Sequence, residues 1–247
     1  MILMMYHPGS EMYVPVFFVL LQSKKTCAYY HALQQCICAS DWKLEAMTFT
    51  SDFEQAIMSQ LKHQFPEGVG IFCLFHFKQA LLRKLKEYGI PAALITALIG
   101  PNGVMNILTE IPIAEMEKGI QYCRWKTDSV EHMAKLNTFW NYFRSTCLIR
   151  YRPEDWNINA FTKEDSLVTL INRTNNPLER FNRELNQAFP TAHPSMNDFV
   201  ATIKKISCEY LYKLNRVDCN SRKKPVHAPV NRYPLPADYA AFVAVSV

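Results

Sequence analysis

The chain has 247 residues, of which 49% are hydrophobic and 20% charged, and a formal net charge of +5, so it should fold as a globule with one large domain or one domain carrying an insertion. Its longest apolar run, YVPVFFVLL, is too short for a bilayer span of about 20 residues, and the N-terminus lacks the order of a signal peptide, so we expect an intracellular protein without a membrane partner. The eight cysteines contain no close C-x-x-C pair, which favours reduced, mostly buried thiols over a secreted disulfide framework.

The first elements predicted from the sequence are a hairpin, a helix and a strand. Apolar runs at residues 1–6 and 13–21 flank the turn-forming sequence HPGSEM, which predicts an antiparallel hairpin. Residues 26–39 repeat apolar positions at intervals of three and four, which predicts a helix. The sequence WKLEAMTFT, residues 42–50, then predicts a strand that ends at the following Ser-Asp pair.

Two further helices alternate with a strand up to residue 90. Four apolar residues spaced by four, with Ser51 as candidate N-cap, predict the first helix: Phe53, Ile57, Leu61 and Phe65. The continuous apolar sequence VGIFCLF, residues 69–75, predicts a buried strand, and HFKQALLRKLKEYG predicts a helix that stops at Gly89. This alternation of strands and helices favours an α/β fold.

The remaining chain is predicted to be helical, with a proline-rich end. Residues 91–165 contain apolar helical segments and loops, which indicates an all-helical insertion rather than more sheet. The helices of residues 166–217 end with a long one over 196–217, and residues 218–247 read as a tail or linker. The predicted domains are therefore a core of residues 1–90, the insertion of 91–165, helices of 166–217 that complete the core, and a Pro-rich tail of 218–247.

Asp52 lies where a strand gives way to a helix. Ligands of open α/β sheets gather at such strand ends, because side chains there point into a crevice. The alternative is that Ser51 and Asp52 cap the following helix. The sequence leaves both interpretations open.

Glu179 offers a similar choice between capping and ligand binding. Pro177 suits the first helical position, which makes Asn176 the N-cap and puts Glu179 at the third position, as in a capping box. Capping does not explain the polar face that Glu179 shares with Arg183, for which a salt bridge is the simplest alternative. If Glu179 and Asp52 converge, their carboxylates could hold divalent metal ions.

Cys73 and His76 stand at C-x-x-H spacing where a strand ends and a helix starts. A structural metal site would need a second ligand pair, and no pair with matching spacing is evident. The alternative is a buried strand cysteine beside a polar residue at a helix end.

Four segments, in this order, resemble the transposase domain of Mutator-like elements, the MULE family: TFTSDFEQAI, CLFHFKQALLRKL, RTNNPLERFNRELN and FPTAHPSMNDFVATIKK. The resemblance covers about residues 1–217. It implies a ribonuclease H-like mixed sheet flanked by helices, with a helical insertion before the last acid-bearing helix. In that family three acidic residues hold Mg²⁺ or Mn²⁺ and the enzyme cuts DNA and joins it to a target.

The resemblance also implies roles for individual residues. Asp52 corresponds to the second acid and Glu179 to the third, so both would be catalytic and would bind the metal. Four further residues would be associated with the site: Cys73, His76, Asn175 and Asn176. The family's first acid belongs to a strand before the hairpin, and this chain begins at the hairpin, so we expect the site to be incomplete.

The leading prediction is a MULE-type transposase domain, ancestrally a metal-dependent DNA cleavage and strand-transfer enzyme, whose own activity is uncertain. The alternative is a transposase-derived module that binds DNA or protein without catalysis, and a third interpretation is a poorly stable truncated product. We expect DNA as the partner in the nucleus and no small-molecule substrate, and self-association is compatible with this reading. Five basic residues are candidates for phosphate contacts: Arg173, Arg180, Arg183, Lys204 and Lys205.

Overall fold

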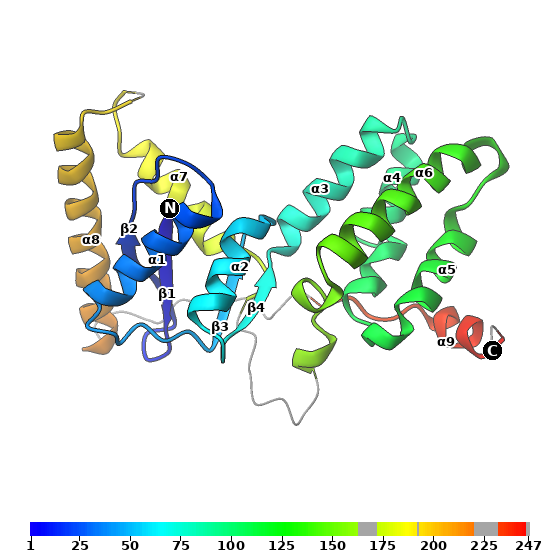
Figure 1. Ribbon diagram of the computed structural model, residues 1–247, viewed down its shortest axis with the longest axis horizontal. Helices are drawn as coiled ribbons and strands as arrows, with labels where there is room; N and C mark the ends of the chain where they lie inside the picture. Colours follow the sequence, from blue (N-terminus) through cyan, green and yellow to red (C-terminus); the bar gives the residue numbers. More distant parts are fainter. Residues whose placement is uncertain (163–171, 192, 220–231, 246–247) are drawn as a thin grey trace. The chain divides into compact units, whose positions relative to one another are not determined.

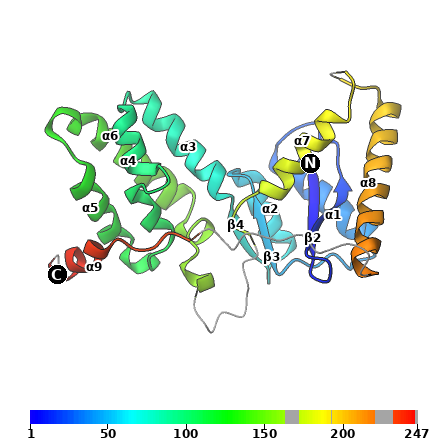
Figure 2. The same cartoon turned by 180° about the vertical axis from the view of Figure 1, so that it is seen from behind.

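The structure, a computed structural model, describes residues 1–162, 172–191, 193–219 and 232–245 (Figure 1; Figure 2 shows the same view from behind). These residues form two compact units. Unit 1 consists of Met1–Leu44 and Asn175–Pro229, and unit 2 of Glu45–Thr174 and Val230–Val247. The described part is mostly helical and carries two small sheets, so the predicted α/β class is confirmed.

The sheet of unit 1 is the predicted antiparallel hairpin. Strand β1 spans Ile2–His7 and pairs with β2, which spans Met12–Phe18 and so ends three residues earlier than predicted. The turn between them is stabilised by the buried Ser10. Its hydroxyl lies 3.0 Å from Nδ1 of His7, and its backbone N–H donates to the same nitrogen.

Three helices complete unit 1: α1 (Thr26–Ala39), α7 (Asn176–Gln187) and α8 (Met196–Asp218). Phe181 and Leu185 of α7 pack with Ile206 of α8 to form an apolar core, against which the hairpin residue Phe18 is packed. The rings of Phe18 and Phe181 lie 5.8 Å apart. The helical periods predicted over residues 26–39 and 196–217 are therefore confirmed, because each follows from side chains that share one buried stripe.

Unit 2 begins with a parallel βαβ arrangement. Strand β3 (Thr48–Ser51) pairs with β4 (Val69–Phe72), and α2 (Gln55–Gln64) connects them. The predicted N-cap at Ser51 is wrong: Ser51 is the last residue of β3, and α2 starts four residues later after Glu54. The predicted strand over residues 69–75 is likewise too long, because the chain turns into α3 (Leu74–Glu87) directly after Cys73.

Helices make up the rest of unit 2, and the described residues between 92 and 162 contain no strand, as the sequence periodicity indicated. The α-helices are α4 (Ala92–Ile99), α5 (Met116–Thr127) and α6 (Met133–Phe143). Shorter turns are the 3-10 helices η1 (Val104–Thr109), η2 (Ile113–Glu115), η3 (Val130–His132), η5 (Pro153–Asp155) and η6 (Asn159–Thr162), and the π-helix η4 (Arg144–Arg150). Apolar side chains of α4, α5, α6, η1 and η4 form one continuous core with those of α3.

The stretch predicted to be a Pro-rich tail contains a helix that the sequence analysis did not predict. Residues Ala237–Val245 form helix α9, which lies beside α5 (Figure 1). Tyr239 is buried against Tyr122, and Phe242 contacts Trp125 with ring centroids 5.4 Å apart. This helix is stabilised by its burial against α5, which removes aromatic surface from water.

One stretch, Ala92–Thr109, is long and apolar enough by length and composition to cross a membrane. It consists of two elements, α4 and η1, separated by a turn at Gly100–Gly103. Leu98, Met105 and Leu108 from this stretch belong to the core of unit 2. We therefore interpret its apolar character as core packing.

The ribonuclease H-like sheet is not directly visible, because the described strands form two separate two-stranded sheets, one in each unit. The two units are defined by packing, whereas the predicted domains are sequence modules, so the predicted domain boundaries stay predictions. All eight cysteines are free, as expected. Only four are buried, so the expectation of mostly buried thiols is wrong: Cys36, Cys73, Cys123 and Cys147.

Gly70 of β4 lets the ring of Phe49 and the sulfur of Met58 pack directly against its backbone. A Cβ atom at this position would lie 2.2 Å from the ring of Phe49 and 2.8 Å from the sulfur of Met58. Both neighbours lie in the packed core, so we expect Gly70→Ala to lower the free energy of unfolding by about 1–3 kcal/mol. Gly9→Ala in the hairpin turn is the control, because there the new Cβ meets only the His7 side chain at 3.1 Å. Equal urea midpoints for the two variants would contradict the close packing at Gly70.

Candidate functional site

The site in unit 2 is built at the carboxyl ends of the two parallel strands. Ser51 of β3 lies opposite Phe72 of β4, so the residues that follow them, Asp52 and Cys73, leave the sheet side by side. The backbone N–H of Cys73 donates to the carbonyl of Ser51 at 2.8 Å, which extends the ladder by one step. The strand register therefore fixes where both residues stand.

Asp52 and His76 are brought together at this edge. His76 is the third residue of α3, and its Nδ1 lies 3.4 Å from a carboxylate oxygen of Asp52. The Asp52 side chain is 53% exposed and that of His76 is 32% exposed, so both can reach a ligand from solvent. The capping alternative for Asp52 is weakened, because α2 begins at Gln55 and its N-cap is Glu54.

Residues 172–174 run along the same edge and are tied to both strands' ends. The hydroxyl of Thr50 donates to the carbonyl of Asn172 at 3.0 Å, and the N–H of Leu74 donates to the carbonyl of Arg173 at 2.9 Å. The first turn of α3 therefore receives an acceptor from a segment distant in sequence, which satisfies one of the donors that a helix N-terminus leaves without an intrahelical partner. This arrangement locks the strand end on which Asp52 stands.

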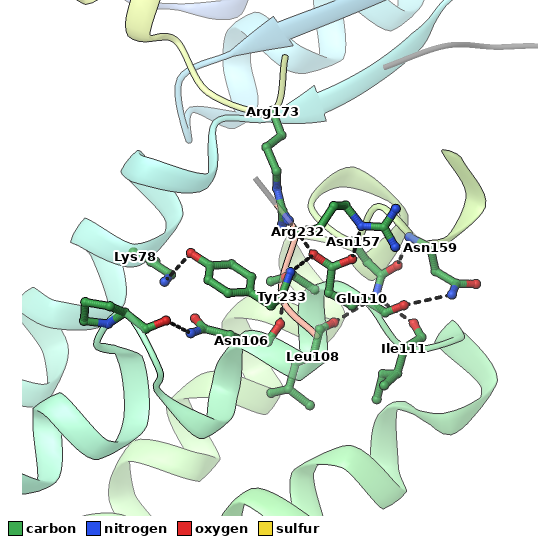
Figure 3. Close-up of polar contacts among 12 residues, drawn as sticks. Lys78, Asn106, Leu108, Glu110, Ile111, Asn157, Asn159, Arg173, Arg232 and Tyr233 are labelled. Atoms are coloured by element: carbon green, nitrogen blue, oxygen red, sulfur yellow. Dashed lines mark hydrogen bonds and ion pairs between the residues drawn. The ribbon is translucent and has the colours of Figure 1, made fainter. Parts of the chain in front are cut away.

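Glu110 is the buried anchor of that segment (Figure 3). Its side chain is 3% exposed and accepts a 2.7 Å hydrogen bond from the guanidinium of Arg173, which is 1% exposed. The same carboxylate accepts from Arg232 at 2.8 Å and from the backbone N–H of Tyr233 at 3.1 Å. The hydroxyl of Tyr233 in turn accepts from Lys78 at 2.8 Å.

Arg173 consequently does not have the exposed position expected of a phosphate contact. Burial lowers the pKa of its guanidinium from the ordinary value, and the neighbouring Glu110 carboxylate opposes that shift. An arginine still stays protonated in proteins, so the pair is ionic. Arg173 anchors its segment within unit 2, and its positive charge is paired with the carboxylate of Glu110.

The amides of two asparagines hold the chain around Glu110. Asn157 Nδ2 donates to the carbonyls of Leu108 at 2.8 Å and Ile111 at 2.9 Å, and Asn159 Nδ2 donates to the carbonyl of Glu110 at 2.8 Å (Figure 3). These bonds fix the backbone on both sides of the carboxylate. The anchor is therefore held from the backbone as well as through its charge.

Glu179 belongs to α7 in unit 1. The helix starts at Asn176 after Asn175, one residue earlier than predicted, so Glu179 is the fourth helical residue and the predicted capping-box position is wrong. Its backbone N–H donates to the carbonyl of Asn175 at 2.8 Å. Asn175 is buried, Asn176 is exposed and Glu179 is partly buried.

The other predicted DNA contacts lie at the surface of unit 1. Arg180 and Arg183 on α7 are exposed, and so are Lys204 and Lys205 on α8. The opposite faces of both helices are the buried ones, which is the amphipathic arrangement that leaves long cationic side chains in solvent. Residues 163–171, which precede the RTNNP sequence, lie outside the described residues.

Sequence reasoning missed Glu110 and Tyr233. Glu110 is a single acid inside the otherwise uncharged run VMNILTEIPI, and an acid in such a run signals a buried, paired carboxylate. Tyr233 lies in the segment that was read as a tail. Its neighbour Arg232 also contributes to the anchor, so the C-terminal segment belongs to the fold of unit 2.

Asp52 is the residue at the strand ends that offers the kind of ligand a hard divalent cation takes. Mg²⁺ prefers carboxylate oxygens and is usually held by one or two carboxylates together with water and substrate phosphates. Asp52 offers such an oxygen on an exposed side chain at a fixed strand end. His76 stands beside it, with Nδ1 3.4 Å from a carboxylate oxygen of Asp52.

Comparison with known proteins gives one match. Residues 1–80 match the MULE transposase domain. The matched residues include the hairpin, α1, the β3–α2–β4 arrangement and the start of α3 with Asp52, Cys73 and His76. No curated protein and no solved structure matches the chain significantly.

Proposed function

We propose that the protein acts on DNA as a transposase-related protein with a divalent-metal site at Asp52. The proposal starts from the match of residues 1–80 to the MULE transposase domain. The observation that carries the proposal is the position of Asp52 within the matched residues, at the end of a parallel strand and 3.4 Å from His76. The ribonuclease H-like fold of the family is part of the proposal. A DNA partner also implies a nuclear location.

The chemistry proposed is metal-dependent phosphoryl transfer on DNA. A bound Mg²⁺ or Mn²⁺ would polarise the phosphate and favour attack by water or a 3′-hydroxyl. Asp52 would hold the cation through its carboxylate. His76 would act as a positioning residue that orients this carboxylate. Cys73 would hold the two strand ends together through the hydrogen bond from its backbone N–H to the carbonyl of Ser51.

Glu179 is proposed as a second metal ligand, and Asn175 and Asn176 as its supporting residues. This part rests on the resemblance of the sequence RTNNPLERFNRELN to the family's third acidic motif, since Glu179 belongs to unit 1. We propose metal and DNA binding as the function of this chain, within the DNA cleavage and strand-transfer chemistry of the family.

Calorimetric titration with Mn²⁺ tests the metal site. We expect the full chain to bind Mn²⁺, and we expect Asp52→Ala and Glu179→Ala to abolish the binding heat because each removes a carboxylate ligand. Asp41→Ala is the matched control, since the Asp41 side chain is 86% exposed and its neighbour Lys43 lies 3.9 Å away. A folded wild-type chain that gives no heat, or an Asp52→Ala variant that binds normally, would rule out this metal centre.

A module that binds DNA without metal is the second candidate. The exposed cations of unit 1 favour it: Arg180, Arg183, Lys204 and Lys205. Such a protein would bind duplex DNA equally well in EDTA and in Mn²⁺, with an affinity that falls steeply with salt, and would not nick it. Loss of DNA binding in EDTA would instead favour the metal-dependent proposal.

A further inference from the structure

The segment that follows α6 is built to hold a rigid position. The last turn of α6 widens into the π-helix η4, Arg144–Arg150, and the chain then continues through Tyr151 to Trp156. A π-helical turn is rare and is often found at functional sites, because it is less favourable than the α-helix it interrupts. The backbone N–H of Tyr151 donates to the carbonyl of Thr146 at 2.8 Å, so the loop begins from a fixed point.

Three contacts anchor this loop to the core of unit 2. The ring of Tyr151 stacks on Phe53 with centroids 4.1 Å apart. The indole N–H of Trp156 donates to the carbonyl of Cys147 at 2.9 Å. The buried Asp155 forms an ion pair with Lys62 of α2. The side chains between these anchors therefore project from a backbone that has little freedom to move.

Two arginines project from the anchored loop into solvent. Arg150 and Arg152 are exposed, and they flank Tyr151 in sequence. Among the residues that the structure describes, Arg150 has no ion-pair partner, and it lies over the Tyr151 ring at 5.6 Å. Arg152 lies 3.6 Å from Glu154, but both side chains are more than half exposed, and such a surface pair holds a charge only weakly.

Arg144 shows the contrast. It belongs to the same π-helix, yet its guanidinium is bound by both carboxylate oxygens of Glu117. That bidentate pair occupies the fork that an arginine would otherwise offer to a phosphate. Arg150 and Arg152 thus keep their donors available to an outside anion.

The loop also stands close to the proposed metal ligand. Tyr151 stacks on Phe53, and Phe53 directly follows Asp52 in the chain. Neighbouring Cα atoms are about 3.8 Å apart, so this path from Asp52 to either arginine spans on the order of 10–20 Å.

We propose that Arg150 and Arg152 are DNA phosphate contacts of unit 2, and that they hold the strand whose reacting phosphate lies at Asp52. This rests on the proposed function, because it takes DNA as the partner and Asp52 as the site of chemistry. The planar guanidinium forks suit phosphate oxygens, and fixed phosphate contacts set the register of a strand without reading its sequence. Tyr151 contributes by fixing the distance between these contacts and Asp52.

The test is a salt titration of DNA binding by the full chain. A fluorescein-labelled duplex is titrated in EDTA and followed by anisotropy, so that the result does not depend on the metal site. The variant is Arg150→Ala with Arg152→Ala. The matched control is Arg83→Ala with Lys86→Ala, which removes the same charge from exposed positions of α3 in the same unit.

We expect the Arg150/Arg152 variant to bind DNA roughly 10- to 100-fold more weakly at 0.1 M salt, and the slope of log K against log salt to fall by about 2. The control should keep the wild-type slope. Unchanged binding by the arginine variant, or an equal loss in both variants, would overturn the assignment while leaving DNA binding intact. If the wild-type chain binds DNA only in the presence of Mn²⁺, the same titration is made in Mn²⁺. A wild-type chain that binds no DNA at any salt, in EDTA or in Mn²⁺, would overturn both this inference and the proposed function. Circular dichroism of each variant checks that it is folded.

Discussion

Replacing Glu110 with alanine is expected to lower the free energy of unfolding by about 3–5 kcal/mol, because it leaves the buried guanidinium of Arg173 without its counter-charge. Both side chains are almost fully buried, at 3% for Glu110 and 1% for Arg173. The change also removes the acceptor of the Tyr233 backbone N–H and of Arg232. Urea unfolding followed by tryptophan fluorescence measures the loss.

An exposed ion pair provides the control for this experiment. Glu117 pairs with Arg144, and the side chains are 52% and 40% exposed, so Glu117→Ala is expected to cost at most about 1 kcal/mol. The double variant Glu110→Leu with Arg173→Met should regain much of the stability, since apolar side chains of similar volume replace a buried pair at little cost. A loss in Glu110→Ala no larger than that in Glu117→Ala would mean that the pair contributes nothing beyond a surface contact.

The Glu110 anchor also bears on the proposed site. It holds Arg173, whose carbonyl accepts from the first turn of α3, and His76 lies in that turn. Loss of the anchor should therefore loosen the position of His76 relative to Asp52 without removing a ligand. Weaker Mn²⁺ binding in a folded Glu110→Gln variant would be the signature of this coupling.

Local patterns in the sequence predicted the elements that depend on one stripe of side chains. The bounds of α1 agree with the predicted helix over residues 26–39, and those of α8 differ from the prediction by one residue. The hairpin was predicted from its turn residues. These features need only neighbours within a few residues, which is the range over which helical and strand periods act.

The strand and helix starts around Asp52 could not be predicted in the same way. The sequence allowed Ser51 to cap a helix, but pairing with β4 takes Ser51 into the sheet instead. Strand pairing is a contact across more than 20 residues here, and propensity yields to it when the partner strand is buried. The same pairing brings Asp52 beside His76. The pairing of β3 with β4 therefore explains both the wrong N-cap prediction at Ser51 and the position of the site.

The arginines show which surroundings the sequence does not reveal. Arg173 stands in a polar motif that suggested a phosphate contact, and in the structure its guanidinium is buried and paired with Glu110, 63 positions earlier. Arg150 and Arg152 lie in RYRPEDWNI, whose aromatic and polar residues suit a surface loop. Which arginine is buried depends on partners distant in sequence, and only the folded chain supplies them.

Replacing Trp156 with alanine is the second large effect that we expect. The side chain is 2% exposed, and its ring stacks on Phe77 with centroids 4.9 Å apart. Removing a buried aromatic ring leaves a cavity and should lower the free energy of unfolding by about 3–5 kcal/mol. Trp42→Ala, at a position 67% exposed in unit 1, should change stability by no more than about 0.5 kcal/mol.

Trp156→Phe separates the ring from its hydrogen bond. Phenylalanine keeps the stacking on Phe77 but leaves the carbonyl of Cys147 without the indole donor, which should cost about 1–3 kcal/mol. Because that bond ties the loop to the π-helix, this variant should also lower the salt slope of DNA binding toward that of the Arg150/Arg152 variant. A stable Trp156→Phe protein with the wild-type slope would show that the arginines hold their positions without the indole, and that Tyr151 and Asp155 are sufficient anchors.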